Sequence, residues 1–139
     1  MAGTSGKSIV QKLGLKPGFC IFVDGLSVAY GDVVGELPAG VRIATTAKGP
    51  FDLVHLFAAE TKALAARLRL YRQAIAPDGM IWVSWPKKSS GVTTDLTDTV
   101  VRKIGLAAGL VDIKVCAVDE VWSGLKFVIP VKDRGRAAK

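Results

Sequence analysis

Short apolar runs, each entered through proline or glycine, recur along this chain of 139 residues and restrict its fold more than any other feature. A nearly unbroken apolar run of five to seven residues behind a turn is typical of a strand that is buried on both faces. Four such strands are predicted, at residues 19–24, 41–45, 51–57 and 80–85.

Amphipathic stretches lie between these runs. Leu64, Leu68 and Tyr71 begin one apolar stripe at helical spacing, which continues to Ile75 before Pro77. A second stripe extends over residues 96–107 and stops at Gly109. Shorter helices are predicted at residues 8–13 and 29–37.

The last two apolar runs have no helix between them. Residues 111–118 and 125–131 alternate in polarity and only six residues separate them, which predicts an antiparallel hairpin. Strands separated by helices form parallel sheets with right-handed crossovers. The sequence therefore predicts one α/β, Rossmann-like domain, with a mostly parallel sheet of about six strands, a C-terminal antiparallel hairpin and helices on both faces.

The formal charge of +7 is concentrated at the two ends. Residues 1–18 carry three lysines and no acid, and residues 132–139 carry four basic residues against Asp133, which gives +3 at each end. Residues 19–131 hold twelve basic and eleven acidic residues, a net of +1. We expect a domain over residues 1–131 with a flexible leader at 1–7, and a basic, flexible tail at 132–139. A nearly neutral body disfavours nucleic-acid binding, except weakly through the basic ends.

Cysteine and histidine usage excludes common metal sites. Cys20 and Cys116 lie far apart in apolar runs, and His55 is the only histidine, so no zinc ligand set is present. We expect free thiols in a reducing compartment and no metal. No apolar run reaches the length of a membrane span, and no signal peptide begins the chain, so a cytoplasmic location is expected. His55 is expected to be a core residue rather than a catalytic base.

The turn after the first strand bears on cofactor binding. A nucleotide cofactor usually needs a glycine-rich turn there and an acid at the end of the second strand. The chain has Asp24-Gly25-Leu26-Ser27 at the first position and no acid within residues 44–48. We therefore expect no cofactor, although Asp24 and Gly25 remain candidates for ligand contact.

Two other segments suit a binding site. Trp85 ends a buried strand and leads into a loop with two lysines and two serines, and a hairpin turn with two acids and a tryptophan follows later. If strand 111–118 is parallel to the others, both segments lie at the carboxyl edge of the sheet, where ligands bind in such folds. The alternatives are a solvated loop, or an ion pair between the acids and the lysines. The candidate ligand-binding residues are Asp24, Gly25, Trp85, Lys87, Lys88, Ser89, Ser90, Asp119, Glu120, Trp122 and Lys126.

Longer strings carry two resemblances. The strings F-D-L-V-H-L-F, A-P-D-G and M-I-W-V, with the closing hairpin, resemble the Rossmann-like sheet of S-adenosylmethionine-dependent methyltransferases. The strings W-P-K-K-S-S-G-V-T-T-D-L-T and D-E-V-W-S-G-L-K-F resemble the bacterial family called domain of unknown function 3052. That resemblance implies a small methyltransferase-like domain and supplies no catalytic residues.

Three hypotheses follow. The first is a methyltransferase-like domain without catalysis, which binds a small anionic ligand or a protein partner at the carboxyl edge. The second is a divergent S-adenosylmethionine-dependent methyltransferase. The third is weak nucleic-acid binding through the basic ends. The sequence favours a protein that is not an enzyme but does not exclude catalysis. It does not indicate the oligomeric state.

Overall fold

A single six-stranded sheet organises the molecule, with strand order β2-β1-β3-β4-β6-β5. The computed structural model describes residues 8–137. The strands are β1 Cys20–Asp24, β2 Arg42–Ile43, β3 Phe51–Phe57, β4 Ile75–Pro86, β5 Val111–Ala117 and β6 Trp122–Val128. The helices are α1 Ile9–Leu13, α2 Tyr30–Val34, α3 Leu64–Ala74, α4 Asp98–Ala107 and α5 Val131–Ala137.

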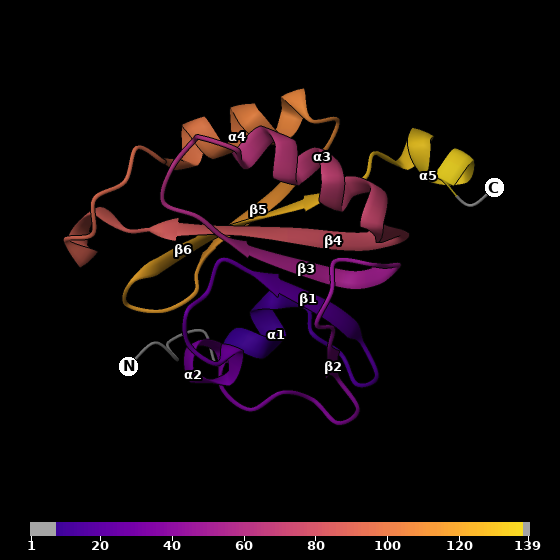
Figure 1. Ribbon diagram of the computed structural model, residues 1–139, viewed down its shortest axis with the longest axis horizontal. Helices are drawn as coiled ribbons and strands as arrows, with labels where there is room; N and C mark the ends of the chain where they lie inside the picture. The colour runs from indigo at the N-terminus through magenta and orange to yellow at the C-terminus, as the bar shows by residue number, and fades with distance from the viewer. Residues whose placement is uncertain (1–7, 138–139) are drawn as a thin grey trace.

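The direction of the strands agrees with the predicted fold class. Strands β1 to β4 pair in parallel, and β6 lies antiparallel between β4 and β5. Helices α1 and α2 cover one face of the sheet, and α3 and α4 cover the other (Figure 1). The chain is therefore a mostly parallel α/β domain in which the closing hairpin supplies one reversed strand, next to the sheet edge.

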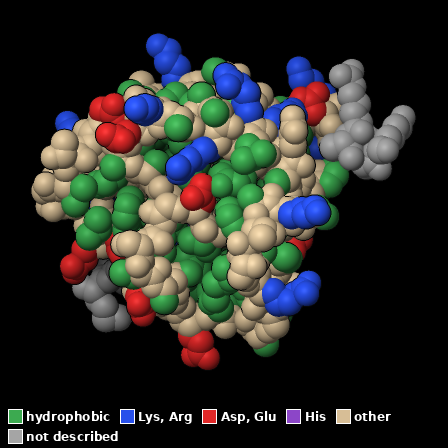
Figure 2. Space-filling model, in the orientation of Figure 1, with side chains coloured by type: hydrophobic (Ala, Val, Ile, Leu, Met, Phe, Trp, Pro, Cys, Tyr) green, Lys and Arg blue, Asp and Glu red, His purple; other side chains and the backbone are tan. Residues whose placement is uncertain are grey.

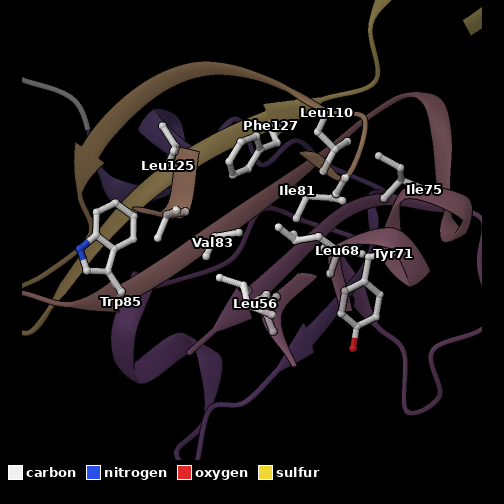
Figure 3. Close-up of a cluster of buried hydrophobic side chains, with 14 of the residues drawn as sticks. Leu56, Leu68, Tyr71, Ile75, Ile81, Val83, Trp85, Leu110, Leu125 and Phe127 are labelled. Carbon is white, nitrogen blue, oxygen red and sulfur yellow. The ribbon is translucent and has the colours of Figure 1, made fainter. Parts of the chain in front are cut away.

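Hydrophobic side chains fill both interfaces between sheet and helices. On the α3 and α4 face, Trp85 lies beside Leu125, and the Tyr71 hydroxyl points out of the cluster (Figure 3). On the α1 and α2 face, Trp82 is fully buried, and its Nε1 donates a hydrogen bond to the Leu13 carbonyl at 2.9 Å. This hydrogen bond fixes the C-terminal end of α1 over the middle of β4.

Several boundaries differ from those predicted. Strand β4 begins at Ile75 rather than at residue 80, because Ile75 pairs with Phe51 and a register shift before the Leu53–Met80 pair accommodates the extra residues of β4. Strand β2 is reduced to two residues. Helix α2 ends at Val34, because Gly35 adopts a positive φ of 91°. Helix α4 is capped by Thr97, whose side chain accepts a hydrogen bond from the Val100 amide.

The C-terminal segment differs from the predicted flexible tail. Helix α5 spans Val131–Ala137, whereas the sequence predicts an unstructured tail from residue 132. Two side-chain contacts hold it: Arg134 Nε donates to the Ile129 carbonyl at 2.9 Å, and Asp133 pairs with Arg72 at 3.0 Å. The predicted leader at residues 1–7 lies outside the described residues, and the division of the chain at residue 131 stays a prediction.

On the face seen in Figure 2, basic and acidic side chains are both present, and neither sign of charge covers the surface alone. This mixture matches the near-neutral charge of residues 19–131. No helix within residues 8–137 has the length and apolar character needed to traverse a bilayer.

Gly105 offers a test of the packing of α4 on the sheet. A methyl group at Gly105 would overlap the ring of Phe127, which is fully buried. We expect Gly105→Ala to lower the free energy of unfolding by about 1–3 kcal/mol, as overpacking does in other cores. Urea denaturation measures the change.

Gly31 in α2 provides the matched control. Nothing lies within 4 Å of a methyl group at this position, so Gly31→Ala should change stability by less than about 1 kcal/mol, in the stabilising direction. Equal losses in both variants would contradict close packing at Gly105.

Candidate functional site

The carboxyl ends of the parallel strands gather the two segments that the sequence singles out. Because β6 is antiparallel to both β4 and β5, β5 runs parallel to β4. The Lys87 amide donates to the Val121 carbonyl at 2.7 Å, and Pro86 is paired with Trp122. The loop after β4 and the turn between β5 and β6 therefore lie side by side, as the strand directions predict.

The loop after β4 lines a cavity of about 290 Å³. Trp85, Lys87 and Lys88 contribute to its wall, together with residues from the start of α4 and from the hairpin. The residues from the other elements are Leu96, Thr97, Asp98, Val115 and Ser123. Sequence reasoning missed this second group, because only the packing of α4 against β5 brings it to the loop.

The two serines of this loop have different positions. Ser90 Oγ donates to the Lys87 carbonyl at 2.6 Å and accepts from the Val92 amide at 3.1 Å, so this side chain shapes a 3₁₀ turn over Lys88–Ser90. Ser89 is exposed. Trp85 is only 5% exposed and serves mainly as core beneath the cavity.

The acids of the hairpin turn do not pair with the lysines. Asp119 Oδ1 accepts hydrogen bonds from the amides of Val121 and Trp122, both at 2.8 Å, and so closes its own turn. Glu120 is exposed. Among residues 8–137, no ion pair joins either acid to Lys87 or Lys88.

Two of the candidate residues lie on the other face of the sheet. Trp122 packs against Phe57 there, with ring centroids 5.0 Å apart. Lys126 is paired with Trp82 in the middle of β4, several residues from the carboxyl edge. Neither residue lines the cavity beside Trp85. The prediction that they share one site with Trp85 is therefore wrong, because the register of the hairpin separates these side chains.

Asp24 forms a second polar centre at the end of β1. The Tyr71 hydroxyl donates to Asp24 Oδ2 at 2.5 Å, and Arg67 lies 3.6 Å from the same oxygen. Burial, and then the hydrogen bond to Asp24, raise the pKa of Tyr71, which therefore remains a donor. The Asp24 side chain is 24% exposed. Arg67 and Tyr71 are four residues apart on one helix, a spacing that places both side chains on the same face. The spacing does not indicate that both contact Asp24.

Gly25 is required by the turn that follows Asp24. Its φ is 82°, and a methyl group there would overlap the Phe57 carbonyl oxygen. The glycine thus lets the chain leave β1 against the end of β3. This contact accounts for Gly25 without any ligand.

His55 is a core residue, as expected. It is fully buried, with Nδ1 hydrogen-bonded to the Tyr30 hydroxyl and Nε2 to Ser84 Oγ, both at 2.7 Å. Its ring stacks on Phe57 at 4.2 Å. Burial lowers the pKa of His55 to about 3, so the ring is neutral at physiological pH.

Comparison with known proteins places this geometry in a fold family. A methyltransferase described as S-adenosylmethionine-dependent, from Aquifex aeolicus, aligns with 86% of each chain at a TM-score of 0.64 and 13% identity. A precorrin-6y C5,15-methyltransferase from Geobacter metallireducens aligns at 0.58 and 10% identity, covering 87% of this chain and 85% of its own. The chain has the methyltransferase fold.

A third structure bears on the cofactor. The 1,6-didemethyltoxoflavin-N1-methyltransferase of Burkholderia thailandensis, solved with bound S-adenosylhomocysteine, aligns at a TM-score of 0.56 and 12% identity, covering 86% of this chain and 73% of its own. This likeness contradicts our expectation of no cofactor. That expectation was wrong because it rested on a short glycine motif, whereas proteins of this fold with a bound cofactor are similar over most of the chain.

No protein-family model matches the sequence, and no curated protein matches it either. The resemblance to domain of unknown function 3052 is therefore not confirmed, and what the comparisons establish is the fold.

The buried histidine predicts a specific pH dependence of stability. In the unfolded chain His55 takes up a proton below pH 6.5, whereas in the folded protein it does so only near pH 3. The unfolded state therefore binds more protons in between, and stability falls as the pH is lowered. We expect a loss of about 2 kcal/mol from pH 7 to 5, with a slope that approaches about 1.4 kcal/mol per pH unit below pH 6.5.

Urea denaturation from pH 7 to 5 measures this slope above the range where most carboxylates titrate. Because His55 is the only histidine, His55→Gln should remove the slope, although it lowers stability at every pH. A variant that keeps the slope would show that another group causes it.

Proposed function

We propose that the chain is a divergent S-adenosylmethionine-dependent methyltransferase-fold domain that binds the cofactor at the carboxyl edge of the sheet, beside Asp24. The observation that carries the proposal is the alignment over 86% of both chains with a methyltransferase. Ligands of open α/β sheets bind at the carboxyl ends of the strands, where Asp24 ends β1.

The residues at this edge of the sheet can form hydrogen bonds to S-adenosylmethionine. Both side-chain contacts to the Asp24 carboxylate, from Tyr71 and Arg67, fall on Oδ2. Within residues 8–137, no hydrogen bond engages Oδ1, which can therefore accept one from a ligand hydroxyl or ammonium group. Tyr71 and Arg67 hold the carboxylate in place before the ligand arrives, which reduces the entropic cost of binding.

The end of β2 lacks the acid that a nucleotide cofactor usually requires at this position. Residues 44–48 contain no acid, and Thr45 and Thr46 are exposed hydroxyl-bearing residues at that position. A hydroxyl forms a weaker hydrogen bond to a ribose than a carboxylate does, so we infer a modest affinity. When bound, S-adenosylmethionine supplies an electrophilic methyl group, and this chain's residues orient it and its acceptor.

We assign the acceptor to the cavity lined by Lys87 and Lys88. Two ammonium groups at its rim favour an acceptor that carries a carboxylate or phosphate. The apolar part of the wall, formed by Trp85, Leu96 and Val115, suits the carbon skeleton of such a molecule. A protein partner with an acidic side chain would satisfy the same groups.

Calorimetric titration with S-adenosylhomocysteine tests the cofactor proposal. We expect binding by the native protein, and an affinity at least about tenfold lower in Asp24→Asn, which loses a charge-assisted hydrogen bond. Asp78→Asn removes the same charge from an exposed position near the opposite end of β4 and should bind as the native protein does.

Folding of Asp24→Asn is checked separately, because asparagine can still accept the Tyr71 hydrogen bond. No heat at millimolar ligand, or equal affinities in the two variants, would refute cofactor binding beside Asp24.

The acceptor proposal has its own test. Lys87→Gln combined with Lys88→Gln should raise the KM for an acidic acceptor at least about tenfold and leave the affinity for S-adenosylhomocysteine unchanged. An exposed pair outside the cavity lining, Lys62→Gln with Lys103→Gln, controls for net charge. Loss of cofactor affinity in the first double variant would contradict the division of roles.

A further inference from the structure

Four lysines gather away from the carboxyl edge, where the hairpin meets α1. Lys114 and Lys126 are directly paired across β5 and β6, so their side chains share one face of the sheet. That face is the one α1 covers, because Lys126 is also paired with Trp82. Like charges directly opposite each other on neighbouring strands destabilise a sheet.

Helix α1 brings the other two lysines to the same place. The Leu13 carbonyl accepts the Trp82 hydrogen bond, so the end of α1 lies over the strand next to Lys126. Lys12 and Lys16 stand on either side of this anchored segment. Two lysine-bearing segments that are about a hundred residues apart in the sequence therefore lie together on the α1 face of the sheet.

The electrostatics agree with this convergence. Burial, and then the charges of Lys114 and Lys16, lower the pKa of Lys126. The neighbouring Cys116 thiol has its pKa raised by burial, an effect that Lys114 and Lys12 oppose. Lys16 and Lys114 thus act on Lys126, and Lys12 and Lys114 act on the adjacent Cys116.

Within residues 8–137, no acid forms an ion pair with any of these four lysines. The ion pairs within residues 8–137 all use arginines, at positions 67, 72 and 102. The lysine cluster, defined as Lys12, Lys16, Lys114 and Lys126, therefore has a repulsive energy that an anionic ligand would relieve.

We propose that the lysine cluster is a binding site for a compact oligophosphate group, such as a di- or triphosphate. Lys16 and Lys114 act on half-buried Lys126 from two separate segments, and Lys12 acts on the adjacent Cys116. This grouping favours a compact polyanion over an extended nucleic-acid backbone. The site is on the α1 face at the middle of β6, apart from Asp24 and from the cavity beside Trp85. It does not rest on the proposed function.

Calorimetry with inorganic tripolyphosphate at low salt tests the site. We expect binding that weakens with added salt, and an affinity reduced about tenfold by Lys126→Gln or by Lys114→Gln. Lys62→Gln and Lys103→Gln change the net charge equally at exposed positions on the α3 and α4 side and should bind as the native protein does. Lys126→Arg keeps the charge and should retain most of the affinity.

The two cysteines provide a second readout in the same molecule. Cys116 shares the face of Lys114 and Lys126, whereas Cys20 packs toward the α3 and α4 side. Tripolyphosphate should slow alkylation of Cys116 and leave that of Cys20 unchanged, as measured by mass spectrometry of the labelled peptides.

Two results would overturn the proposal. One is equal loss of affinity in the cluster and control variants, which would mean that only net charge matters. The other is tight binding of a single-stranded RNA oligonucleotide with no binding of tripolyphosphate, which would assign the surface to nucleic acid.

Discussion

The pairing of β4 with an antiparallel β6 is the constraint on which the rest of the structure depends. It extends from Met80 and Val128 to Pro86 and Trp122, and it covers the edge of β4 that would otherwise be open. Because β5 can then pair only with β6, the hairpin turn comes to the carboxyl edge beside Lys87. The same pairing directs Leu125 and Phe127 toward α4, and Lys126 toward α1.

Much of the fold could be predicted from periodicity and turns. Strands β1 and β3 and the two longer helices follow directly from the spacing of apolar residues, since burial of one helical stripe or of both strand faces requires that spacing. The predicted position of the hairpin turn was conditional on a parallel β5, and the structure meets that condition. Boundaries were less accurate where pairing with a neighbour decided them, as at Ile75.

The candidate site was harder to predict, because it depends on which face each side chain occupies. Trp85 and Trp122 are near neighbours at one end of the sheet, yet the pleat places them on opposite faces. The partners of Asp24 lie 43 and 47 residues further along the chain, at Arg67 and Tyr71, and no local motif connects them. The cofactor expectation failed for the same reason, since it judged a three-dimensional site by one short segment.

The hydrogen-bonded chain from Tyr30 through His55 to Ser84 joins α2, β3 and β4 through the middle of the core. A neutral imidazole has one donor and one acceptor, so the hydroxyl at one end donates a hydrogen bond to the ring and the hydroxyl at the other end accepts one from the ring N–H. The chain therefore has two self-consistent polarities, and a change from one to the other must move all of its hydrogens together. In this core, the tautomer of the His55 ring therefore determines the orientation of two hydroxyl groups from distant segments.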